Sequence, residues 1–214
     1  MTTSLVVVGA GGFGRETLDV IEAINRVAKV PVFDLLGVVD SDPSSINLSR
    51  LRARNITYLG SESDWLALGN RPQYLVGIGN PTTRQRVHER FDAAGLVAAT
   101  AIHPNATVGS MSQIAEGTVI CSGAEISTNV KIGRHVHINP NATVGHDSIL
   151  NEFVSVNPAS TISGEVSVGA GTLIGAGATV LQGLAIGSRV VVGASACVVK
   201  DVPDGITVKG VPAR

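Results

Sequence analysis

The feature that most constrains this 214-residue chain is a six-residue repeat that fills its second half. From Ile102 to Val198, every sixth residue is Ile, Val or Leu, without an insertion or deletion. A second column, four residues after each aliphatic position, holds Ala, Ser, Thr or Val everywhere except at Leu184. A period of six fits neither an α-helix nor a coiled coil, whose periods are about 3.6 and 3.5 residues. The repeat therefore predicts a β-solenoid with one flat face every six residues and the aliphatic side chains inside.

A third column, directly after the aliphatic one, holds Gly at seven positions and Asn at three. Both residue types tolerate a positive φ, so we expect this column to turn the corners of the coil. Three faces of six residues close a triangular coil of 18 residues, and successive coils stack about 4.8 Å apart. Aromatic residues make up only 3% of the chain, as a narrow interior filled by small aliphatic side chains requires.

The first part of the chain, residues 1–98, follows a different pattern, in which apolar strands alternate with helices. Strands are expected over three segments, residues 4–9, 35–40 and 73–79. Helices are expected after the first and third of these, to about residue 28 and from Asn80 to about residue 94. This alternation predicts a small α/β domain with a parallel sheet, followed after a short linker by a second domain over residues 99–214.

A Gly-rich segment follows the first predicted strand, with Gly9, Gly11 and Gly14 in the spacing of a dinucleotide-binding loop and Asp40 at the end of the next strand. Glycines allow a phosphate to approach the backbone, and a helix N-terminus attracts anions. The alternative is a tight strand–helix turn without a ligand. The predicted sheet is too small for a complete two-half dinucleotide fold, which argues against NAD, but one half can hold the nucleotide of a nucleotide-sugar.

Charge and composition exclude several classes of protein. The net charge is −1 and no run of Lys or Arg occurs, so nucleic acid and membrane surfaces are not expected partners. No apolar run reaches the roughly 20 residues that span a bilayer, and the first residues lack the basic region of a signal peptide. Cys121 and Cys197 form no spaced motif, which favours a reducing, cytoplasmic location.

The repeat resembles the left-handed parallel β-helix of the hexapeptide-repeat acyltransferases, and residues 198–205 and 209–214 are similar to the family's closing segment. With the Gly-rich domain in front, nearly the whole chain resembles the sialic acid O-acetyltransferase and UDP-4-amino-sugar N-acetyltransferase group. The resemblance implies a small Rossmann-like α/β domain before the β-helix. It also implies acetyl-CoA as co-substrate, a sugar acceptor, no metal, and a homotrimer with active sites between neighbouring β-helices.

The segment from Asn139 to Asp147 is similar to the family's catalytic segment, which implies that His146 is the general base and that Asp147 orients it. The resemblance further implies contacts with acetyl-CoA at Asn139, Gly164, Ala176 and Ala194. It places a nucleotide-sugar site at Gly11, Gly12, Phe13, Gly14, Asp40 and Asp42.

Two departures from relatives leave the acceptor open, since some relatives have His in place of Phe13 and an acidic residue in place of Ser41. Several relatives also have a second His in place of Ser155, which bears on the support of the acetyl group. Among the other histidines, we expect His103 in a capping turn. His135 and His137 could line a cleft, but we expect a passive role at the surface for each.

The predicted function is transfer of an acetyl group to an amine or hydroxyl of a sugar, either a nucleotide-linked amino sugar or a sialic acid-like sugar. Two alternatives remain. One is a non-catalytic scaffold that binds a nucleotide-sugar. The other is a zinc enzyme of the γ-carbonic anhydrase type, although its H-x4-H pair is absent from the sequence.

Overall fold

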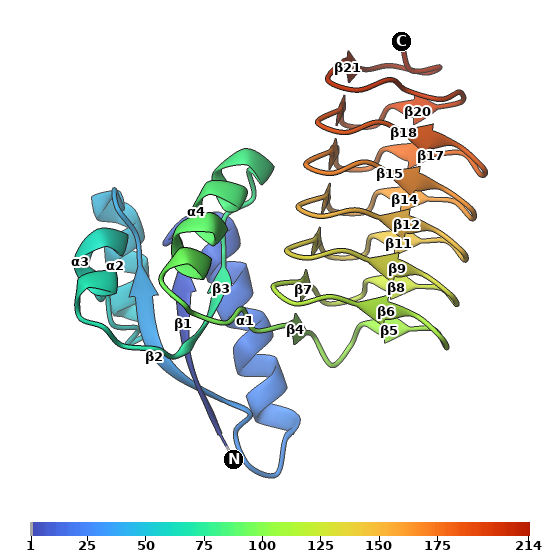
Figure 1. Ribbon diagram of the computed structural model, residues 1–214. Helices are drawn as coiled ribbons and strands as arrows, with labels where there is room; N and C mark the ends of the chain where they lie inside the picture. Colours follow the sequence, from blue (N-terminus) through green and yellow to red (C-terminus); the bar gives the residue numbers. More distant parts are fainter. Residues whose placement is uncertain (1) are drawn as a thin grey trace. The chain divides into compact units, whose positions relative to one another are not determined.

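The computed structural model describes residues 2–214; residue 1, where the predicted first domain begins, lies outside the described residues. The chain forms two compact units, one ending at Ala101 and the other spanning Ile102–Arg214 (Figure 1). Ala98 pairs with Tyr74 in a parallel bridge, so the first unit includes the linker that the sequence predicts near residues 96–101. Within the described residues, no helix has the length and apolar character needed to cross a membrane.

The first unit is a three-stranded parallel sheet in the order β2-β1-β3 with four helices, which confirms the predicted α/β class. Its elements are β1 (Thr3–Val8), α1 (Gly12–Val27), β2 (Phe33–Val39), α2 (Ser45–Ala53), α3 (Glu62–Ala67), β3 (Gln73–Val76) and α4 (Pro81–Ala93). Leu5 to Val8 in β1 are fully buried, as expected for the central strand of a sheet covered on both faces. Asn80 caps α4 by accepting a hydrogen bond from the Thr83 amide at 2.9 Å.

Helices α2 and α3 were not expected from the sequence. Each is short and buries few side chains, among them Leu51 in α2 and Trp65 in α3, so neither leaves a clear helical period. Their N-caps were the available signal: the Ser44 and Ser61 hydroxyls accept hydrogen bonds from amides three residues later, at 3.3 and 3.2 Å.

The second unit is a parallel β-helix built from two-residue strands, with three strands to each 18-residue coil. One face holds seven strands, β4 (Ala101–Ile102), β7 (Val119–Ile120), β10 (His137–Ile138), β13 (Ser155–Val156), β16 (Leu173–Ile174), β19 (Val191–Val192) and β21 (Thr207–Val208). The next holds β5 (Thr107–Val108), β8 (Glu125–Ile126), β11 (Thr143–Val144), β14 (Thr161–Ile162), β17 (Thr179–Val180) and β20 (Cys197–Val198). The third holds β6 (Gln113–Ile114), β9 (Lys131–Ile132), β12 (Ile149–Leu150), β15 (Ser167–Val168) and β18 (Ala185–Ile186).

Columns of turns join these faces, and we name each edge by the strands of one coil. The β10–β11 edge contains residues 139–142 and those 18 apart from them, and the β11–β12 edge contains residues 145–148 and their counterparts. The β12–β13 edge contains residues 151–154 and their counterparts. Figure 1 shows the coils stacked in chain order from β5 to β21.

The predicted aliphatic column forms the core of the β-helix. From Ile120 to Val198 these side chains are at most 3% exposed, while Val108 in the first coil is 39% exposed because no complete coil lies beneath it. Hydroxyls of the second column, which holds the small residues, are buried and form hydrogen bonds. Ser148 donates to the Ser163 carbonyl at 3.0 Å and accepts from the Val166 amide at 3.2 Å.

The third column lies at the start of each turn, as predicted, but its residues do not have the positive φ that we expected there. The residues with positive φ lie two positions later, at every sixth residue from Met111 to Ser195. The glycines directly after the aliphatic column are needed for another reason. A Cβ at Gly109 would lie 2.6 Å from the Ser127 carbonyl carbon, and one at Gly145 would lie 2.4 Å from that of Ser163. These glycines therefore allow close stacking of coils rather than an unusual backbone conformation.

Candidate active site

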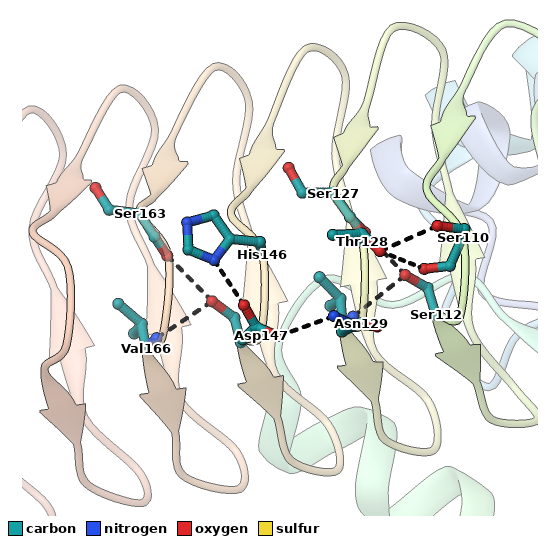
Figure 2. A network of polar contacts seen from close by, with 11 residues as sticks. Ser110, Ser112, Ser127, Thr128, Asn129, His146, Asp147, Ser163 and Val166 are labelled. Carbon is teal, nitrogen blue, oxygen red and sulfur yellow. Dashed lines mark hydrogen bonds and ion pairs between the residues drawn. The ribbon is translucent and has the colours of Figure 1, made fainter.

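His146 and Asp147 lie side by side on the β11–β12 edge, immediately after β11 (Figure 2). Nδ1 of His146 is 2.7 Å from Oδ2 of Asp147. The two side chains are 57% and 47% exposed, so both are open to solvent. With Nδ1 engaged by the carboxylate, Nε2 is the ring nitrogen that faces away from Asp147 and can accept a proton.

The Asp147 carboxylate has a second partner in the coil below. Its Oδ1 accepts a hydrogen bond from Nδ2 of Asn129 at 3.0 Å. The hydrogen bond with His146, and after it the one from Asn129, lower the pKa of Asp147 below its ordinary value. Asp147 also has a φ of +60°, a conformation that Asp tolerates better than most residues. The carboxylate is thus held ionised beside the imidazole.

Gly164 lies one coil above His146, at the position predicted to contact the thioester. A Cβ there would lie 2.5 Å from Nε2 and 2.6 Å from Cε1 of the imidazole. Any side chain at this position would therefore displace the ring. The absence of a Cβ brings a backbone segment close to the ring nitrogen that can act as a base.

The other residues predicted to contact acetyl-CoA lie on a different edge. Asn139, Ala176 and Ala194 belong to the β10–β11 edge, and the two alanines, 18 residues apart, are exposed. Asn139 is 7% exposed, and its amide donates to the Val156 carbonyl at 3.0 Å. The structure thus brings Gly164 to His146, and places Asn139, Ala176 and Ala194 one face away on the same β-helix.

The Gly-rich loop of the first unit contains two kinds of glycine. At one kind a Cβ would clash with neighbouring backbone, and at the other a Cβ would meet no atom. A Cβ at Gly14 would lie 1.9 Å from the Gly9 carbonyl oxygen, so Gly14 is required by packing between β1 and α1. Gly11 and Gly12, by contrast, have no atom within 4 Å of such a Cβ. Gly11 is the N-cap of α1 and has no side-chain cap, which leaves this helix end accessible to an anion. Phe13, at the second position of α1, is half-buried.

Asp40 organises the loops that follow β1 and β2. Its carboxylate accepts hydrogen bonds from the Ala10 amide at 2.7 Å and from the Asp42 amide at 2.9 Å. The Tyr58 hydroxyl donates to its carbonyl at 2.9 Å. The exposed carboxylate of this segment is instead that of Asp42.

Sequence reasoning missed two charged residues beside these loops. Glu62, at the start of α3, is 5% exposed and forms an ion pair with Arg90 of α4. Desolvation raises the pKa of Glu62, while Arg90 and a hydrogen bond with Ser41 oppose this rise. Arg84 is fully buried in α4, where burial lowers its pKa to about 9. Its guanidinium donates to the Ile78 carbonyl at 2.8 Å and so braces the loop after β3.

The expectation that His135 and His137 lie at the surface was wrong, because both are fully buried. The ring of His135 stacks on that of Phe153, with centroids 5.4 Å apart and planes 5° from parallel. A Cβ at Gly117 would lie 2.3 Å from Nδ1 of His135, so that position also requires glycine. His103 lies near the start of the β-helix, where its Nδ1 accepts a hydrogen bond from the Asn105 amide at 3.0 Å.

A parallel β-helix of six-residue repeats that carries an exposed His–Asp pair, preceded by a small α/β domain with an open Gly-rich helix end, defines the class of hexapeptide-repeat acyltransferases. Comparison with known proteins agrees. The model of the PglD N-terminal domain family matches residues 4–91. GDP-perosamine N-acetyltransferase of Escherichia coli O157:H7 is 32% identical over 145 residues, which cover 68% of this chain and 63% of that protein.

Several solved structures match almost the entire chain, among them PerB and the acetyltransferase domain of PglB. PerB from Caulobacter crescentus, in complex with CoA and GDP-perosamine, has 30% identity and a TM-score of 0.86, covering 99% of this chain and 96% of that one. The acetyltransferase domain of PglB from Neisseria gonorrhoeae FA1090, in complex with acetyl coenzyme A, has 30% identity and a TM-score of 0.85, covering 100% and 99%. The chain belongs to the family of hexapeptide-repeat sugar acetyltransferases, as its sequence predicted, and its β-helix is left-handed.

Proposed function

We propose that this protein transfers the acetyl group of acetyl-CoA to the amino group of a nucleotide-linked sugar. The observation that carries the proposal is the His146–Asp147 pair, whose Nε2 lies beside the backbone of Gly164 in a chain that matches CoA-bound sugar acetyltransferases along its whole length. An amine acceptor is favoured over a hydroxyl for two reasons. The relative from Escherichia coli is a GDP-perosamine N-acetyltransferase, and the PerB structure contains GDP-perosamine.

In the proposed reaction, the nitrogen of the sugar amine attacks the thioester carbonyl, and Nε2 of His146 takes a proton from this amine. Asp147, bonded to Nδ1, stabilises the imidazolium that forms. The Gly164 amide donates to the oxygen of the tetrahedral intermediate. Collapse of the intermediate breaks the C–S bond, and the departing CoA thiolate takes the proton back from His146. Acetylated sugar and free CoA are the products, with no net change on the protein.

We propose that the acetyl-CoA site requires two copies of the chain. On one copy, Asn139, Ala176 and Ala194 lie on a different edge from His146. Six residues per face separate neighbouring edges by roughly 15–20 Å, too far for one ligand atom to touch both. Packing the β10–β11 edge of one β-helix against the β11–β12 edge of the next brings the two sets together, and repeating this contact around a threefold axis closes a homotrimer.

We propose that the first unit holds the nucleotide. The helix end at Gly11 and Gly12, where an added Cβ would meet no atom within 4 Å, suits a diphosphate next to Phe13 at the start of α1, and the packing of Gly14 fixes the position of this helix end. Asp40 shapes this loop through the Ala10 and Asp42 amides rather than by offering a free carboxylate. The exposed Asp42 carboxylate is available to the donors of a ribose or base. We also propose a reducing, cytoplasmic location, because Cys121 and Cys197 form no spaced motif in the sequence.

The test is a screen of nucleotide-linked amino sugars and sialic acids with acetyl-CoA, following the release of free CoA. We expect turnover on at least one nucleotide-linked amino sugar and none with the His146→Ala variant. Turnover on sialic acids alone would contradict an amine acceptor and show that the acceptor group is a hydroxyl. Turnover that persists without His146 would remove its assigned role, and no turnover on any sugar would leave the scaffold alternative.

A further inference from the structure

The His146–Asp147 pair lies on an exposed edge, so its side chains depend on hydrogen bonds rather than on packing to stay in one position. Asp147 is 47% exposed, and two hydrogen bonds hold its carboxylate. One is with His146, the residue that it has to orient. The other comes from Asn129 and is the contact that ties the carboxylate to the rigid coil below.

The repeat determines this second contact. Asn129 precedes Asp147 by 18 residues, which is one coil, and their φ values are +61° and +60°. Their side chains therefore leave the backbone in the same direction from stacked positions, as Figure 2 shows. A short side chain bridges the coil spacing of about 4.8 Å. Asn combines the two properties required here, since it tolerates a positive φ and donates a hydrogen bond to a carboxylate.

We propose that Asn129 is a positioning residue for acyl transfer, which fixes the Asp147 carboxylate so that His146 keeps its proton on Nδ1 and presents Nε2 as the base. The proposal rests on the proposed function of His146. Which nitrogen of a neutral imidazole carries the proton is set by the hydrogen bond that the other makes. A carboxylate that swings into solvent no longer selects the Nδ1–H tautomer, and part of the enzyme then has its proton on the wrong nitrogen.

The experiment compares three variants. Asn129→Gly removes the amide without backbone strain, because Gly accepts the same φ. Asn129→Asp keeps the size and the tolerance of positive φ but sets a carboxylate against that of Asp147. Asn55→Gly is the matched control, since Asn55 also has a positive φ of 56° and lies in the first unit. Thermal unfolding checks that all three fold.

Two measurements are made on each variant. The first is the His146 tautomer, from nitrogen and carbon NMR of protein labelled at its five histidines, without substrate and with the His146 signals assigned by their absence in His146→Ala. We expect Nδ1–H in the wild type and in Asn55→Gly, and a shift toward Nε2–H in both Asn129 variants. The second is acetyl transfer, where kcat falls about tenfold in Asn129→Gly while the KM for acetyl-CoA stays within about twofold.

Asn129→Asp separates positioning from a merely structural role. A residue that only fills the edge is replaced well by Asp, whereas a positioning residue is not, so we expect this variant to lose at least as much kcat as Asn129→Gly. If both Asn129 variants keep the wild-type His146 tautomer and the wild-type kcat, the proposed role of Asn129 is overturned. The proposed role of His146 as the base is not affected by that result. If the wild type acetylates no sugar, the tautomer measurement still tests Asn129, so the two failures are distinguishable.

Discussion

Two edges of the same β-helix, produced by the same six-residue repeat, have different chemistry. The β11–β12 edge, called the polar edge below, carries exposed polar side chains joined across coils, with His146, Asp147 and Asn129 in one hydrogen-bonded set. The β10–β11 edge, called the smooth edge below, presents exposed Ala176 and Ala194 in one column and buries the Asn139 amide. The repeat fixes the backbone of both edges, and the residues at its solvent-facing positions give one edge a hydrogen-bonded polar set and the other a column of small side chains.

The largest expected effect comes from the polar edge. His146→Ala removes the proposed base, so kcat should fall by about 1,000-fold, within the range that general-base catalysis contributes. The KM for acetyl-CoA should change little, because the smooth edge is intact. Steady-state kinetics measures both. His103→Ala, a histidine outside the polar edge, is the control and should keep near wild-type kcat.

The next largest effect tests the close approach of Gly164 to the imidazole. Gly164→Ala places a methyl group where a Cβ would lie 2.5 Å from Nε2, so the ring must move and kcat should fall about 100-fold. In the His146→Ala background the same change should cost almost nothing, since no ring is present to displace. Equal losses in both backgrounds would show that Gly164 acts independently of His146.

A smaller effect is expected on the smooth edge. Ala194→Trp should raise the KM for acetyl-CoA about tenfold, because an indole would occupy the surface on which the cofactor lies, while kcat at saturation stays near wild type. Ala170→Trp, on the β12–β13 edge, is the matched control. A loss confined to kcat, or the same loss in both variants, would argue against a cofactor surface on the β10–β11 edge.

The smallest effect concerns stability against pH. Hydrogen bonds from His146 and Asn129 lower the pKa of Asp147 in the folded protein. A lowered pKa means that the ionised carboxylate stabilises the fold above its unfolded pKa, and that this contribution is lost as pH falls through the folded pKa. The Tm difference between wild type and Asp147→Asn should therefore be small at neutral pH and disappear in acid. A difference that grows in acid would contradict the assigned contacts.

The sequence predicted the β-helix because a period of six fits neither an α-helix nor a coiled coil. The His146–Asp147 pair was expected because its segment resembles the catalytic segment of a known family. The sequence did not predict why Gly follows the aliphatic column, since the clash that Gly145 avoids is with the backbone of the next coil. The Asn129 contact was within reach, because an 18-residue coil places Asn129 below Asp147. The burial of His135 was not, because a six-residue period describes which positions point outward and not what covers them.

We propose that His146 of one copy works on acetyl-CoA held by the β10–β11 edge of another copy. Refolding an equal mixture of His146→Ala and Ala194→Trp chains tests it at acetyl-CoA concentrations far below the wild-type KM, where each variant alone is weakly active. If each site combines edges from two copies, random mixing restores both intact edges in about a quarter of sites, and activity should rise to about a quarter of wild type. If each chain forms its own site, no mixed assembly regains activity, and the mixture will show only the average of its two components.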